Sequence, residues 1–168
     1  MTSAEQPGAS GDSSARSGQL QNDISRDLYR EAVGVVTGMQ DDVDPKYSMR
    51  KFLEDAISRY CTELEREYNQ GQRWSQATTL KRGGFNPTAR TAGEVEQLQS
   101  WIAPSIRGRC YGAVNGMKLR TPTYTLRDFL ESAIDRHSSA LKREHATARW
   151  IPLDRLRRGR RGSNIPME

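Results

Sequence analysis

The sequence has few of the residues on which metal binding, disulfide bonding and most enzyme catalysis depend. Two cysteines and two histidines occur among its 168 residues, and no Cys–His pairing or glycine-rich phosphate loop accompanies them. Without such a constellation we expect a protein that is not an enzyme, holds no metal and needs no cofactor. Cys61 and Cys110 are expected to be buried, reduced thiols of a cytoplasmic protein.

Long apolar runs are missing as well. No stretch approaches the roughly 18 apolar residues that a membrane-spanning helix needs. The N-terminus also lacks the basic segment and following apolar run of a secretion signal. We therefore expect a cytoplasmic protein without a membrane partner. The 26 Lys and Arg residues exceed the 21 Asp and Glu residues, and the net charge of +5 is compatible with an anionic partner.

What the chain does contain is an internal repeat. Gln19-Leu20-Gln21-x-x-Ile24 returns as Gln97-Leu98-Gln99-x-x-Ile102, with an offset of 97 − 19 = 78 residues. The block Tyr47–Ile57 returns as Tyr124–Ile134, with an offset of 124 − 47 = 77 residues. A unit that occurs only twice favours two halves around one shared core, because a solenoid usually needs at least about three units.

The repeat divides the chain into five parts. Residues 1–18 are mostly Ser, Gly, Ala and Thr and cannot bury enough apolar surface to fold, so we expect a disordered tail. The first unit covers 19–84, a connector covers 85–96, the second unit covers 97–162, and 163–168 form a short end. The sequence leaves open whether the two units pair within one chain or across two chains of a homo-oligomer.

Each unit is predicted to fold as a strand followed by two helices. The opening residues of each unit alternate between two faces, which is typical of a strand. Apolar stripes at helical spacing then predict an amphipathic helix in each unit, formed by Leu28, Ala32, Val35 and Met39 and by Ile106, Cys110, Ala113 and Met117. A longer helix follows, and Ser48 and Thr125 stand where its N-cap should be.

This order of elements resembles the ribbon-helix-helix fold of DNA-binding proteins. The Tyr47–Ile57 block, Leu64-Glu65-Arg66-Glu67-Tyr68-Asn69-x-Gly71 and Trp74 resemble plasmid-partition centromere-binding proteins of the ParB type from actinobacteria. The second copy keeps Tyr124–Ile134 and Leu141–Glu144 but has His145-Ala146 in place of Tyr-Asn. The resemblance implies a mainly α fold with short β-strands, in which two tandem units form a pseudo-dimer.

The resemblance also implies a DNA-binding surface, because the paired strands of this fold enter the major groove. Base readers carried over by position are Gln19, Gln21, Asp23, Gln97, Gln99 and Trp101. Phosphate contacts would come from Ser48 and Thr125 with Arg50 and Arg127, at the N-termini of the long helices. Neither strand carries Lys or Arg, and Asp23 and Trp101 break the repeat, so an asymmetric DNA site is expected.

The C-terminal end adds a basic arm. It holds five arginines interleaved with glycine: Arg155, Arg157, Arg158, Arg160 and Arg161. Such a composition is typical of a flexible arm that binds nucleic acid. The predicted function is therefore that of a sequence-specific, double-stranded DNA-binding adaptor in plasmid or chromosome partition, which also regulates its own operon. A partition ATPase would supply energy and dock on residues 1–18. The alternatives are a transcriptional repressor, antitoxin or relaxosome accessory protein of the same fold, or a helical scaffold that binds no DNA.

Overall fold

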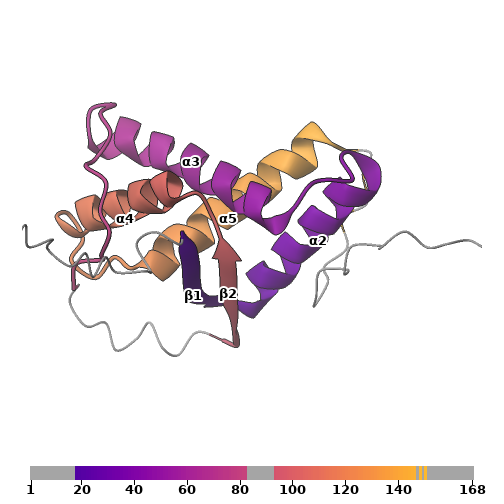
Figure 1. Ribbon diagram of the computed structural model, residues 1–168, viewed down its shortest axis with the longest axis horizontal. Coiled ribbons are helices and arrows are strands. Elements are labelled where there is room, and N and C mark those ends of the chain that lie inside the picture. The colour runs from indigo at the N-terminus through magenta and orange to yellow at the C-terminus, as the bar shows by residue number, and fades with distance from the viewer. Residues whose placement is uncertain (1–17, 83–92, 147, 149, 151–168) are drawn as a thin grey trace, which may run out of the picture.

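The computed structural model of the chain describes residues 18–82, 93–146, 148 and 150. In chain order, these residues form β1 (Gln19–Ser25), α2 (Arg26–Asp42), α3 (Met49–Tyr68), β2 (Val95–Trp101), α4 (Pro104–Lys118) and α5 (Leu126–Glu144). The described part thus holds four helices and one two-stranded sheet, and the order strand, helix, helix occurs twice (Figure 1). β2 begins at Val95, within the segment that the sequence assigned to the connector.

The two strands pair antiparallel and form a ribbon with one buried and one exposed face. Gln21 lies opposite Gln99 at its centre. Because side chains alternate along a strand, Leu20, Ile24 and Leu98 all point to the inner face, where each is at most 2% exposed. Two strands alone would be unstable in water, so this inner face depends on the helices that cover it. Figure 1 shows α2 and α4 on opposite sides of the ribbon.

Three of the four described helices, α3, α4 and α5, begin where the sequence provides a start signal. Pro104 occupies the first turn of α4, where its missing N–H is not needed. The Ser48 side chain accepts a hydrogen bond from the Lys51 backbone N–H and caps α3. Thr125 caps α5 in the same way and forms a reciprocal capping box with Asp128. The two predicted N-caps are therefore confirmed.

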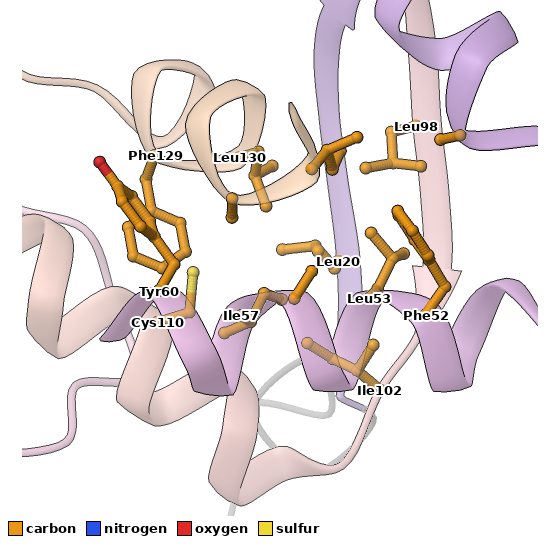
Figure 2. Close-up of a cluster of buried hydrophobic side chains, with 14 of the residues drawn as sticks. Leu20, Phe52, Leu53, Ile57, Tyr60, Leu98, Ile102, Cys110, Phe129 and Leu130 are labelled. Atoms are coloured by element: carbon orange, nitrogen blue, oxygen red, sulfur yellow. The ribbon is translucent and has the colours of Figure 1, made fainter. Parts of the chain in front are cut away.

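The core is built across the two halves of the chain. We call β1, α2 and α3 the first half and β2, α4 and α5 the second half. Each short helix packs mainly on the long helix of the other half, α2 on α5 and α4 on α3, and the two long helices pack on each other. Figure 2 shows Phe129 and Leu130 of α5 facing Ile57 and Tyr60 of α3. The ring centroids of Tyr60 and Phe129 are 5.0 Å apart, and those of Phe52 and His137 are 5.1 Å apart.

The segment that follows α3 runs back along α4. Its backbone lies close to Gly112, where an added Cβ would stand 2.2 Å from the Ser75 carbonyl oxygen. The Lys81 N–H donates to the Asn115 side-chain oxygen at 2.8 Å, and the Asn115 amide donates to the Thr79 carbonyl at 3.0 Å. Trp74, which belongs to this segment, is partly buried against the core. The segment thus adds a second layer to the side of α4.

The described residues also bear on the predicted absences. None of their helices is both long and apolar enough to cross a membrane. Within the same residues, His, Cys, Asp and Glu do not gather in a group of three or more that could hold a metal ion.

Cys61 and Cys110 are buried free thiols, as predicted. Burial raises the pKa of Cys61 to about 12 and that of Cys110 well above its ordinary value.

Candidate nucleic-acid interface

The outer face of the ribbon brings together the six residues that the sequence singled out as base readers. They form three cross-strand pairs: Gln19 with Trp101, Gln21 with Gln99, and Asp23 with Gln97. All six are exposed except Gln19, which is partly exposed. Antiparallel pairing places directly opposite side chains on one face about 5 Å apart, so these pairs form one continuous surface.

This surface is rich in amides and carries one negative charge. Four of the six side chains are glutamines, each of which offers one acceptor oxygen and a donor amine. Val95 lies on the same face opposite Ser25 and is 45% exposed. Sequence reasoning missed Val95, although the alternation of Val95, Gln97, Gln99 and Trp101 carries the signal. The exposed face therefore has an apolar side chain, Val95, at one end and hydrogen-bonding glutamines next to it.

One end of the ribbon lies beside the start of α3. A shallow hollow of about 350 Å³ joins the two elements and is lined by Tyr29, Met49, Arg50, Leu98, Gln99, Ser100 and Trp101. The Arg50 side chain is 59% exposed, and Trp101 is 53% exposed. The hollow therefore places a guanidinium and an exposed indole next to the central pair of the ribbon.

A second hollow borders the other part of the ribbon. It measures about 440 Å³ and is lined by Gln19, Gln21, Asn22, Asp23, Gln97, Arg107 and Tyr111. The guanidinium carbon of Arg107 lies 4.6 Å from the centroid of the Tyr111 ring, a cation–π contact. Arg107 takes the position that Tyr29 holds in the first half, since 107 − 78 = 29. Sequence reasoning overlooked Arg107 and Tyr29. Comparing these equivalent positions would have shown that the two halves place different side chains beside the ribbon.

Arg50 and Arg127 stand at opposite ends of the ribbon, each held by a glutamate. Arg50 pairs with Glu54 at 2.6 Å, and Glu54 also accepts from the Ala103 N–H just beyond β2. Arg127 pairs with Glu131 at 2.7 Å, which accepts from the Ser25 N–H at the end of β1. Because the strands are antiparallel, these two junctions lie roughly 20 Å apart along a seven-residue ribbon. The glutamates thus fix each arginine relative to the strands.

The N-termini of the two long helices differ in charge. The first turn of α3 holds Arg50 and Lys51 and no acidic residue. The first turn of α5 holds Asp128, whose carboxylate accepts from the Thr125 N–H at 2.9 Å and places a negative charge at this N-terminus. A helix N-terminus favours an anion through its free N–H groups and its dipole. The Ser48 end is therefore better suited to a phosphate than the Thr125 end.

The remaining predicted phosphate contacts, Arg155, Arg157, Arg158, Arg160 and Arg161, lie outside the described residues. Directly after β1, Arg26 pairs with Glu94 at 2.5 Å and with Glu96 at 3.5 Å. These ion pairs neutralise one end of the interface. Arg50, Arg107 and Arg127 are further basic residues beside the ribbon, and Arg50 and Arg127 are likewise paired with glutamates.

Comparisons with known proteins do not identify a relative, since no protein-family model, curated protein or solved structure matches this chain. The function must therefore be inferred from the residues and their geometry.

Proposed function

We propose that this chain is a tandem ribbon-helix-helix protein that binds double-stranded DNA in a sequence-specific manner. The observation that carries the proposal is the ribbon itself, which buries one face on four helices and presents three cross-strand pairs, mostly of polar residues, on the other. A two-stranded ribbon has the width of the B-DNA major groove, and its exposed side chains can reach base edges there.

The central glutamine pair is the best candidate for base recognition. A glutamine amide can pair with N6 and N7 of adenine through two hydrogen bonds, and Gln21 and Gln99 lie opposite each other. Asp23 can accept a hydrogen bond from cytosine N4, whereas Trp101 offers an apolar contact for a thymine methyl group. Since these two residues occupy equivalent places in the two halves, the recognised DNA site would be asymmetric.

Phosphate contacts would set the register of the protein on the duplex. Arg50 and Arg127 flank the ribbon at both ends, where the sugar-phosphate backbones pass on either side of a groove. The N-terminus of α3, which has Ser48 and no acidic residue, would bind a phosphate more tightly than the N-terminus of α5. The arginines between 155 and 161 would add contacts that do not depend on base sequence.

The biological role that we propose is that of a centromere-binding adaptor in plasmid or chromosome partition, which also regulates its own operon. The support is the resemblance of the long-helix blocks to partition proteins of the ParB type. A partition ATPase would bind residues 1–18 and supply the energy. A repressor, antitoxin or relaxosome accessory protein would use the same surface and differ in its DNA site.

Binding of selected DNA by the wild-type chain and by Gln99→Ala tests the proposal. Loss of one good base contact should weaken cognate binding by about 1–3 kcal/mol and relax one base position, with little change on random DNA. The matched control is Gln72→Ala, the same substitution at an exposed glutamine beyond the C-terminal end of α3, which should leave specificity intact. Equal losses on cognate and random DNA would show that Gln99 is not a base reader.

Salt dependence separates DNA binding from a helical scaffold. Phosphate contacts release counterions, so the affinity should fall steeply between about 50 mM and 200 mM salt. Absent binding, or binding that does not change with salt, would favour the scaffold alternative.

A further inference from the structure

Two ion pairs join the halves of the chain at equivalent positions with opposite signs. Arg109 of α4 contacts Glu65 of α3, with Nη2 and Oε1 2.5 Å apart. Lys142 of α5 contacts Glu31 of α2, with Nζ and Oε1 2.7 Å apart. Position 109 corresponds to 31, since 109 − 31 = 78, and position 142 corresponds to 65, since 142 − 65 = 77. The acid and the base have therefore exchanged places between the two contacts.

The first of these pairs is deeply buried. The side chain of Glu65 is 4% exposed and that of Arg109 is 15% exposed. Arg109 also donates to the Thr62 hydroxyl at 3.1 Å. A buried carboxylate without a cation is strongly disfavoured, so position 109 must carry a base when position 65 carries an acid. The Lys142–Glu31 pair is about one-third exposed and adds to the same preference.

The reversed signs matter when like halves are brought together. If a second copy of the first half replaced the second half, Glu31 would take the place of Arg109 and would face Glu65 at both contacts. If a copy of the second half replaced the first half, Arg109 would face Lys142 at both contacts. Either pairing brings like charges together in a poorly solvated interface, which opposes association.

Two other sets of contacts between the halves do not discriminate by charge. Phe52 and Phe129 are equivalent and equally buried, so the aromatic core would accept either half. Arg59 pairs with Glu144, and its equivalent Arg136 pairs with Glu63, so an arginine meets an acid from either side. Partner choice must therefore come from positions where the repeat differs, and 31, 65, 109 and 142 are such positions.

We infer that the charge-reversed pairs Glu65–Arg109 and Glu31–Lys142 make the halves of this chain pair first with second and reject like halves of other copies. The interaction surface is the contact of each short helix with the opposite long helix, and its partner is the other half of the same chain. The asymmetric outer face of the ribbon, with Asp23 on one strand and Trp101 on the other, is then assembled in one way only.

Exchanging the charges within one pair tests this inference in the full chain. Glu65→Lys with Arg109→Glu keeps an ion pair within the chain. Each half then carries an acid on its short helix, at 31 or 109, and a base on its long helix, at 65 or 142. Like halves could then pair without repulsion. Glu31→Lys with Lys142→Glu has the same effect on the more exposed pair and is the variant less prone to folding defects. The matched control exchanges both pairs, which restores the sign reversal.

Differently tagged copies of each protein are unfolded together, refolded at high concentration and captured through one tag, and the second tag is then measured. We expect several-fold more co-captured chain for each single-pair exchange than for the wild type. The four-residue exchange should return to the wild-type level. Equal co-capture by all four proteins would overturn the inference. Increased co-capture by the four-residue exchange would do the same, since it would trace the effect to a general disturbance of charge.

Discussion

The close approach of the Gln72–Arg82 segment to α4 predicts that Gly112→Ala destabilises the protein, against the usual effect of this change in a helix. An added Cβ would lie 2.2 Å from the Ser75 carbonyl oxygen and 3.1 Å from its carbonyl carbon. Backbone atoms of this segment cannot turn aside as a flexible side chain can. The segment must therefore move away from the helix to accommodate alanine.

The magnitude follows from what that movement would break. Besides an exposed contact of Lys118 Nζ with the Lys81 carbonyl oxygen, three hydrogen bonds tie the segment to α4: Ala77 N–H to Gly108 O at 3.1 Å, Lys81 N–H to Asn115 Oδ1 at 2.8 Å, and Asn115 Nδ2 to Thr79 O at 3.0 Å. Each contributes about 0.5–1.5 kcal/mol net. Alanine returns about 1 kcal/mol through its higher helix propensity. The free energy of unfolding should thus fall by about 1–3 kcal/mol, which lowers Tm by roughly 4–12 °C.

Urea denaturation and amide hydrogen exchange would measure this prediction. The Lys81 amide should lose protection in Gly112→Ala. Gly108→Ala is the control on the same helix, because its Cβ would meet only the flexible Gln76 side chain, at 3.1 Å from Oε1. That variant should be as stable as the wild type or more stable. A Gly112→Ala protein with wild-type stability and a protected Lys81 amide would refute the reasoning.

Three further predictions concern His137, the two cysteines and the C-terminal arginines. Burial and the nearby Arg59 cation lower the pKa of His137 below its ordinary 6.5. The free energy of unfolding should therefore fall as the pH drops below about 6.5, where the unfolded chain takes up a proton, and His137→Tyr should remove this part of a urea-denaturation pH profile. Cys61 and Cys110 should resist a thiol reagent at about pH 8 until urea unfolds the chain, and a fast-reacting native thiol would contradict their burial. Deletion of residues 155–168 should weaken binding to cognate and random DNA about equally in a titration, whereas a loss confined to the cognate site would argue against a basic arm.

Local patterns in the sequence were enough to predict the elements and their faces. The alternation around Gln21 and Gln99 identified both strands and the side that faces solvent, because a period of two places alternate residues on one face. Ser48 and Thr125 marked the starts of the long helices, because a side-chain oxygen there satisfies a free N–H. The first two strand residues of the second half, Val95 and Glu96, were missed, since they lie among turn-forming and charged residues.

Pairing and charge environment required the tertiary structure. Whether β1 meets β2 of its own chain depends on contacts between residues about 78 positions apart, which no local period encodes. The same holds for Arg107 and Tyr29 beside the ribbon. The charges at 31, 65, 109 and 142 stand in the sequence, but their meaning appears only once each short helix is seen against the opposite long helix.

The sequence by itself thus determined which residues form the exposed face of each strand, because that depends on neighbours along the chain. Only the tertiary structure decided how the two faces combine into one asymmetric surface, because that depends on which distant side chains share a buried or charged contact.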